Sequence, residues 1–200
     1  MTMTVSSIVP SSTALLLMDF EPAVLAAVPD PDTLLARTQA ALSWARSQQV
    51  QVCYVRVAFT DEDFGAVPSH SKAFAAIAQN RFLAADSPEA QIHESLEVRD
   101  EDVVVRKTRF GAFSTTDLYA SLRARGIDTL VLAGISTAGV VLSTVRHAAD
   151  DDYRIYVLAD ATADPDPEVH RVLIEKVLPA QADVITTSDL AALSGEGLKL

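Results

Sequence analysis

The feature that most constrains the fold is an alternation of short apolar runs with longer amphipathic stretches. The run "TALLLMDF" at 13–20 is apolar at nearly every position, which is typical of a strand buried on both faces. Between such runs lie stretches with apolar residues at helical spacing, for example 31–50. Strands that alternate with helices form right-handed βαβ units. The pattern therefore predicts an α/β fold, with a mostly parallel sheet and helices on both faces.

The chain of 200 residues is 49% apolar, which is enough for the core of one domain spanning 1–200. We expect residues 1–12 to be an extended N-terminal arm and 60–101 to be a long loop or insert. A connection of that length usually carries function or an oligomer contact. The expected strands are 13–20, 50–59, 102–107, 128–134, 154–160 and 182–187, and the expected helices are 31–50, 115–126, 137–151 and 166–178, with short helical pieces near 73–82 and 188–194.

Charge and hydropathy exclude several classes of partner. The net charge of −11 repels phosphate backbones, and the one basic stretch, "VRKTRFG", is short, so no nucleic acid is expected. No apolar run approaches the roughly 20 residues of a membrane-spanning helix. The N-terminal residues lack the features of a signal peptide, so the expected location is the cytoplasm.

Neither a metal nor a cofactor is expected. Cys53 is the single cysteine, and its position in the strand "VQVCYVRV" favours a role in core packing. The four histidines, His70, His93, His147 and His170, lie far apart and form no paired motif. A metal-dependent amidase would need a histidine near 56–63, and "RVAFTDED" has none.

Two charged residues follow apolar strands, where ligands bind in open parallel sheets. Asp19 follows "LLLM", and Lys107 follows "VVVR". A buried acid costs several kcal/mol unless it is paired. We expect the two side chains to pair, either as a structural ion pair or as a catalytic acid or base whose pKa the lysine tunes.

Three segments together resemble the isochorismatase-like superfamily, also called the cysteine hydrolases. They are "ALLLMDFEPAV", "VVVRKTRFGAFSTTDL" and "GIDTLVLAGISTAGVVLSTVRHAADDDYRIYVLADATAD", and the resemblance runs from about 13 to 190. It implies a Rossmann-like, three-layer fold with six strands. It also implies a catalytic triad in which Asp19 and Lys107 match the first two members, and a cis peptide bond between Ile135 and Ser136.

The third member of that triad, a cysteine, falls on Val140, which cannot act as a nucleophile. The resemblance also covers true isochorismatases, which have glycine there and hydrolyse a vinyl ether with the aspartate as acid and water as the attacking group. Backbone N–H groups of Gly139 and Val140 remain as candidates to hold an oxyanion or a substrate carboxylate. The bulk of valine at this position puts isochorismate itself in doubt.

Four further residues are candidates for the substrate pocket: Phe20, Arg109, Phe113 and Ser143. Aromatic walls with one guanidinium suit a small, flat molecule, including one that carries a negative charge. The phenylalanines could equally be core residues, and Ser143 is a weak candidate for a replacement nucleophile. A polar partner from 60–101, such as Gln79, Asn80 or Gln91, is a further possibility.

Two hypotheses of different classes follow. The first is a cysteine-free hydrolase that uses Asp19, Lys107 and water on a small molecule with a vinyl-ether or amide-type bond. The second is an inactive family member that binds a metabolite or serves as an interaction module. Contact between the two side chains within about 4 Å at the bottom of a pocket beside Gly139 would favour the enzyme. The resemblance further implies a homodimer or homotetramer.

Overall fold

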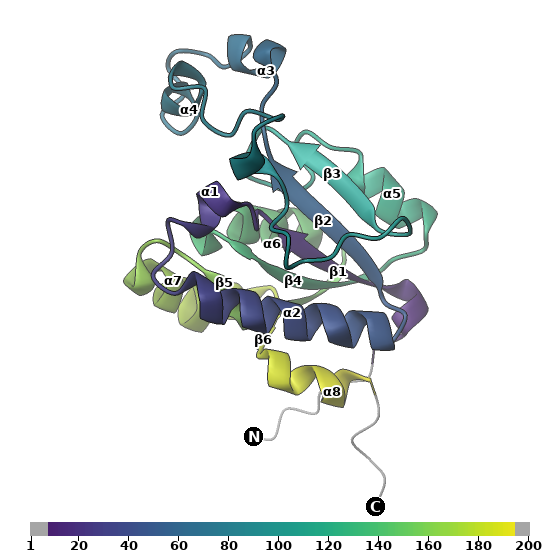
Figure 1. The fold of residues 1–200 in the computed structure, drawn as a ribbon. Coiled ribbons are helices and arrows are strands. Elements are labelled where there is room, and N and C mark those ends of the chain that lie inside the picture. The colour runs from purple at the N-terminus through teal and green to yellow at the C-terminus, as the bar shows by residue number, and fades with distance from the viewer. Residues whose placement is uncertain (1–7, 195–200) are drawn as a thin grey trace, which may run out of the picture.

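A computed structural model describes residues 8–194 of the chain (Figure 1). Its centre is a six-stranded sheet in the order β3-β2-β1-β4-β5-β6, and every neighbouring pair is parallel. The predicted α/β class and parallel sheet are therefore confirmed. The strands are β1 Thr13–Met18, β2 Gln51–Val57, β3 Val103–Lys107, β4 Thr129–Ile135, β5 Arg154–Ala163 and β6 Asp183–Ile185.

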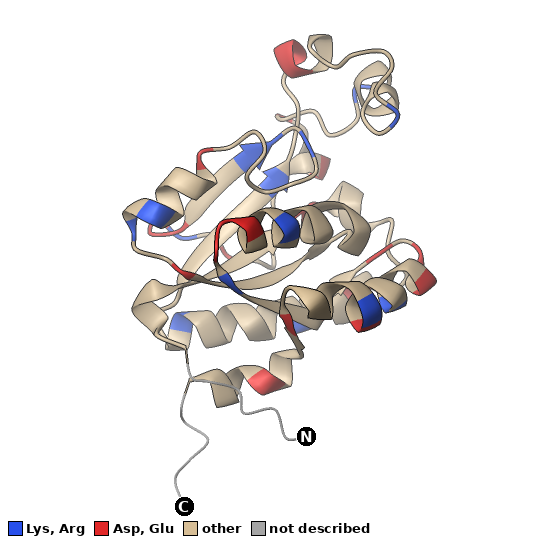
Figure 2. Ribbon diagram, turned by 180° about the vertical axis from the view of Figure 1, so that it is seen from behind, with Lys and Arg blue, Asp and Glu red and all other residues tan. Residues whose placement is uncertain are grey.

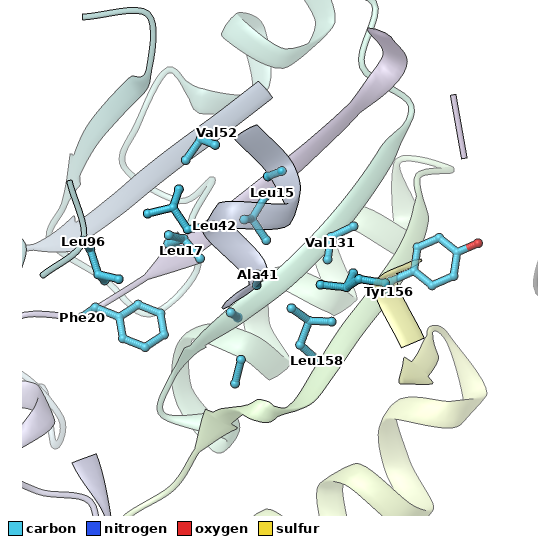
Figure 3. Packing of buried hydrophobic residues seen from close by; sticks show 14 of the residues in the cluster. Leu15, Leu17, Phe20, Ala41, Leu42, Val52, Leu96, Val131, Tyr156 and Leu158 are labelled. Atoms are coloured by element: carbon cyan, nitrogen blue, oxygen red, sulfur yellow. The ribbon is translucent and has the colours of Figure 1, made fainter. Parts of the chain in front are cut away.

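Helices cover both faces of the sheet and form two hydrophobic cores. On one face, α2 packs against β1, β4 and β5, as Figure 3 shows for Leu15, Leu42 and Val131. On the other face, α5 and α6 pack against the same sheet. The helices are α1 Pro22–Leu25, α2 Pro31–Ser47, α3 Asp61–Gly65, α4 Ala75–Gln79, α5 Leu118–Ala124, α6 Leu142–Asp150, α7 Pro167–Val172 and α8 Leu190–Leu193.

Local sequence signals explain where these helices begin and end. Asp30 accepts the N–H of Thr33 at the start of α2, and a proline follows it at the first helical position. Asp166 caps α7 in the same way, through the N–H groups of Glu168 and Val169. After α5 the chain turns at Gly126, whose φ of +67° glycine adopts without a steric penalty.

The long connection between β2 and β3 forms a small lobe that projects from the sheet (Figure 1). We call residues 58–90 the lobe; it contains α3, α4 and a 3₁₀ turn at Pro88–Ala90. The rings of Phe59, Phe64 and Phe74 form its core, with ring centroids 5.4 and 6.3 Å from Phe59. The lobe therefore has its own aromatic packing beside the two main cores.

The two ends of the described chain lie together. Ile8 is buried and donates its N–H to the carbonyl of Leu193, and Pro10–Ser12 form a 3₁₀ turn. The described part of the expected arm is therefore a packed turn, and 1–7 lie outside the described residues. Acidic residues are spread over several elements of the rear view in Figure 2. No helix within 8–194 combines the length and apolar character needed to cross a bilayer.

Candidate functional site

The ends of β1, β3 and β4 bring the predicted acid, the lysine and the turn together. Asp19 follows β1 directly with φ of +61°, a conformation that Asp tolerates better than most residues. Lys107 is the last residue of β3, beyond the neighbouring β2. Its Nζ lies 2.7 Å from Oδ2 of Asp19 and donates a second hydrogen bond of 3.1 Å to the carbonyl of Arg109.

This ion pair is buried almost completely. Lys107 is 2% exposed and Asp19 is 5% exposed. Burial disfavours the carboxylate and raises the pKa of Asp19 from 3.8 to about 6, although Lys107 opposes the shift. Oδ1 of Asp19 has no hydrogen-bond partner among the described residues. An acid with a free oxygen and a pKa near neutrality can exchange a proton with a ligand.

A second acid, Glu21, lies beside the pair and was not among the predicted residues. Its side chain is fully buried, and Oε1 accepts the N–H of Val57 at the end of β2. Burial raises the pKa of Glu21 well above its usual range, and the charge of Asp19 raises it further. The only sequence signal was its position, two residues after an acid at a strand end.

The turn after β4 has the conformation that the resemblance implies, with a cis peptide bond between Ile135 and Ser136. Thr137–Val141 then form one wide π-helical turn that leads into α6. Oγ of Ser136 accepts the N–H of Gly139 at 3.1 Å, and a Cβ at position 139 would lie only 2.8 Å from that oxygen. A larger residue at this position would therefore require Ser136 to change its side-chain conformation.

Side chains already engage two N–H groups of the turn. The N–H of Ala138 donates to Oδ2 of Asp164 at 2.8 Å, while Gly139 donates to Ser136. Thr137 shares a hydrogen bond of 2.8 Å with Nδ1 of His170. A ligand oxygen at the N–H of Gly139 would have to compete with Ser136, so this group is less available than the sequence suggested.

A cavity of about 270 Å³ lies between the ion pair and the turn. Asp19 and Lys107 line one side, and Ser136, Gly139 and Val140 line the other. Apart from Arg109, the rest of the lining is apolar. It comes from α1 and the residues after it, the lobe, the ends of β2 and β4 and the loops after β3 and β5: Ala23, Val24, Ala27, Val57, Phe74, Ile77, Phe82, Leu83, Phe110, Ile135 and Pro165.

The rim of this cavity carries Arg109, as predicted, together with aromatic rings. The Arg109 guanidinium lies 5.2 Å from the ring centroid of Phe74, within the range of a cation–π contact. Phe110 packs on Phe74 at 4.9 Å and stays 49% exposed. Phe82 from the lobe is 47% exposed. These rings make an apolar entrance with one positive charge.

Three predicted pocket residues do not line the cavity. Phe20 is buried in the core on the α2 face, where Figure 3 places it beside Leu96, because the chain turns sharply at Asp19. Phe113 lies under the loop after β3 and stacks on Tyr153 in the opposite core. Ser143 lies further along α6, packed near Gly111 rather than at the cavity.

The lobe contributes apolar residues to the cavity but none of the expected polar partners. The side chain of Asn80 donates to the carbonyl of Ala76 within α4, and Gln91 bonds to Arg56 and to backbone carbonyls. Gln79 is exposed and also lies outside the cavity lining. The sequence did not predict the four lobe residues that line the cavity. The pattern of a long connection does not indicate which part of the sheet it covers.

The cysteine and the acidic and histidine side chains away from the cavity do not form a second reactive site among the described residues. Cys53 is buried, and burial raises the pKa of its thiol to about 12, which keeps it unreactive. Within 8–194, no three His, Cys, Asp or Glu side chains gather as ligands of a metal ion would. Asp160 accepts hydrogen bonds from the N–H and hydroxyl of Thr187, so it orients a loop.

Comparison with protein families matches residues 13–189 to the Isochorismatase domain. The uncharacterized isochorismatase family protein YecD of Escherichia coli O157:H7 is 38% identical over 96 residues, which are 48% of this chain and 51% of that protein. A probable isochorismatase of Pseudomonas chlororaphis is 28% identical over 187 residues, covering 92% of this chain and 87% of the relative. The first relatives in order of similarity thus match over about half their length or less.

Solved structures show the same architecture. A cysteine hydrolase from Pseudomonas syringae pv. phaseolicola 1448A superposes with a TM-score of 0.84 at 25% identity, covering 94% of this chain and 95% of that one. An isochorismatase family protein from Burkholderia thailandensis gives 0.81 at 27% identity, covering 94% and 98%.

Proposed function

The chain belongs to the isochorismatase family of hydrolases, and we propose that it hydrolyses a small molecule by acid–base catalysis with water instead of a cysteine nucleophile. The observation that supports this most directly is the buried contact of 2.7 Å between Lys107 and Asp19 at the bottom of the cavity. An inactive protein has no need of such a pair, since burying the two charges costs free energy that apolar residues would not.

Proton transfer from Asp19 suits a vinyl ether. The carboxylic acid gives its proton to the terminal carbon of the double bond, whose π electrons form the new C–H bond. The cation left on the ether-bearing carbon takes up water, and the carboxylate of Asp19 accepts the proton that the water loses. The resulting hemiketal then breaks its C–O bond as its hydroxyl proton passes to the leaving oxygen, which gives a ketone and an alcohol, and Asp19 ends the cycle protonated as it began.

Lys107 adjusts the acidity of this group. Its ammonium donates to Oδ2 of Asp19, so it stabilises the carboxylate that forms when the proton leaves. Oδ1, which has no partner among the described residues, is the oxygen free to carry the proton. The raised pKa of about 6 keeps a useful fraction of Asp19 protonated near neutral pH.

Val140 argues against covalent catalysis, because its isopropyl group fills the place of the family cysteine. The apolar lining of the cavity, with Arg109 at the rim, suits a small and largely apolar substrate whose anionic group Arg109 binds. We further propose that the protein works in the cytoplasm as a homodimer or homotetramer and binds neither nucleic acid nor membranes.

The test is a turnover assay with purified protein on small vinyl ethers, isochorismate among them, and on a panel of small amides. The matched variants are Asp19→Asn, and Asp86→Asn at an exposed position in the lobe. We expect turnover of the vinyl ether that falls by about 10²–10⁴-fold in Asp19→Asn and is unchanged in Asp86→Asn.

Other outcomes separate the remaining possibilities. Hydrolysis of an amide at a rate that survives Asp19→Asn would mean that another group provides the chemistry, and the proposed mechanism would be wrong. The substitution at Val140 favours a second candidate, an inactive member that binds a metabolite. Binding of panel compounds by folded wild-type protein without any turnover would support that second function.

A further inference from the structure

A buried cluster beside the cavity contains two acids and one lysine; Asp19 and Lys107 line the cavity, and Glu21 lies next to them outside its lining. Glu21 is 0% exposed, Asp19 is 5% exposed and Lys107 is 2% exposed, so all three groups are almost completely shielded from bulk water. Lys107 contacts Asp19 but has no hydrogen bond to Glu21 among the described residues. Two ionised carboxylates here would leave one negative charge unpaired in a buried site, at a cost of several kcal/mol.

The contacts of Glu21 fit a neutral acid that holds a strand. At the end of β1 the N–H of Asp19 still donates to the carbonyl of Val55 on β2. Glu21 then continues this ladder with its side chain, since Oε1 accepts the N–H of Val57 where the backbone of β1 has turned away. A protonated carboxyl accepts this bond through its carbonyl oxygen, which needs no negative charge.

We propose that Glu21 is a positioning residue that stays protonated in the resting site, holding the end of β2 and leaving Asp19 as the one carboxylate paired with Lys107. The proposal rests on the proposed function only in giving Asp19 the role of acid. Charged groups that face Glu21 from neighbouring elements are Asp19 at β1 and Lys107 at β3, and burial with the charge of Asp19 raises the pKa of Glu21 accordingly.

With Glu21 protonated, the cluster of three side chains holds one proton more than the Asp19–Lys107 pair alone would hold. With Glu21 neutral, the charges of Lys107 and Asp19 balance, and Asp19 can release and regain a proton without a second anion beside it. Ionisation of Glu21 would place a competing carboxylate near Lys107. It would then be harder for Asp19 to lose its proton, and the acid would be weaker.

The test is an NMR titration of side-chain carboxyl ¹³C signals in wild-type protein, Glu21→Gln and the control Glu89→Gln, an exposed glutamate in the lobe. Gln resembles a protonated Glu in shape and in its lack of charge. We expect the pKa of Asp19 in Glu21→Gln to stay within about 0.3 of the wild-type value. We also expect the one wild-type glutamate signal that Glu21→Gln removes to have the chemical shift of a protonated acid at neutral pH.

A pKa of Asp19 that falls by about one unit or more in Glu21→Gln would overturn the proposal, because it would mean that wild-type Glu21 carries a charge. A Glu21→Leu variant tests the positioning part. It removes the acceptor for Val57 and should lower the melting temperature, whereas Glu21→Gln should keep it, and equal stability of all three proteins would overturn this part. No substrate is needed, so the result stands apart from the turnover assay.

Discussion

The two walls of the cavity, both formed at the carboxyl ends of strands, differ in what they can do. By the charged wall we mean Asp19 and Lys107, which line the cavity, together with Glu21, which is buried beside them outside the lining. By the turn wall we mean the turn at 135–141, from which Ile135, Ser136, Gly139 and Val140 line the cavity. In the charged wall, one oxygen of each acid lacks a partner among the described residues. In the turn wall, the N–H groups of Ala138 and Gly139 are already bonded, and Val140 offers only an isopropyl group.

This difference indicates that the groups suited to proton transfer and the position suited to a covalent nucleophile lie on different parts of the fold. The charged wall is complete without help from the turn, because its ion pair is made between β1 and β3. The turn wall keeps its conformation without a nucleophile, because Ser136 and Asp164 hold it from the side. On the proposed mechanism, valine in place of a cysteine would therefore remove covalent attack and leave proton transfer in place.

The largest expected effect comes from breaking the charged wall. Lys107→Met leaves Asp19 buried without its partner, and this should lower the free energy of unfolding by about 3–5 kcal/mol. Urea denaturation followed by circular dichroism measures the change. Lys72→Met, at an exposed position in the lobe, is the control and should have little effect.

A double variant sharpens this result. Asp19→Asn together with Lys107→Met removes both charges of the pair, so neither charge is buried alone. The double variant should therefore recover a large part of the free energy of unfolding that Lys107→Met loses. Full additivity of the two single effects would show that the side chains do not interact, contrary to the 2.7 Å contact.

The pH dependence of catalysis is the next largest effect. If protonated Asp19 is the acid, kcat/KM should be constant below pH 6 and fall about tenfold per pH unit above the pKa of about 6. Initial rates on a vinyl ether in buffers of constant ionic strength provide the profile. A rate that instead rises above pH 6 would require the ionised form of Asp19 as the active one.

The ionisation of Asp19 also makes the stability of the folded protein depend on pH. The pKa of Asp19 is about 6 in the folded protein against 3.8 when unperturbed, so the folded state binds the proton more tightly. Its contribution to stability is therefore largest below pH 3.8 and is lost as the pH rises through about 6. Asp19→Asn should remove this part of the pH dependence in urea melts measured between pH 4 and 8.

The turn wall should accept a thiol where the wild type has none. Val140→Cys places a thiol in the cavity near Lys107, and iodoacetamide should alkylate it at least about tenfold faster than the wild-type protein. Mass spectrometry measures the modification, and Cys53 serves as the internal control because it is buried. Equal labelling of both proteins would show that Cys53, not position 140, is the accessible thiol.

The smallest effect concerns the size of that side chain. Val140→Ala removes two methyl groups from a residue that is 2% exposed, and it should cost about 1–2 kcal/mol of stability. The same change enlarges the cavity, so we expect KM for a vinyl-ether substrate to fall or stay constant while the pH profile is unchanged. Urea melts and initial rates measure the two effects separately.

The sequence predicted the charged wall only in part, and the reason is local. Asp19 and Lys107 stand directly after apolar strands, where a charge is conspicuous. Glu21 stands before a proline that opens a short helix, where an acid is common and indicates nothing about burial. Its burial and its hydrogen bond to Val57, on a strand distant in sequence, are visible only in the folded structure.

The pocket residues show the corresponding limit. Alternation along a strand predicts which face a side chain occupies, but it stops where the backbone leaves the strand. The positive φ of Asp19 sends Phe20 into the core, and the loop after Lys107 places Phe110 at the rim and Phe113 underneath. The apolar pattern alone does not distinguish these aromatic residues.

The wide turn at Thr137–Val141 also determines what the deletion of one residue from it would do to the site. Each residue of an ordinary helix advances the side-chain direction by about 100°, and a π-helical turn accommodates one extra residue within that spacing. Deleting a single residue from this turn would let it relax to α-helical geometry and bring a neighbouring side chain to the position that Val140 now occupies. The group that faces the ion pair can therefore be exchanged by a shift of register as well as by substitution.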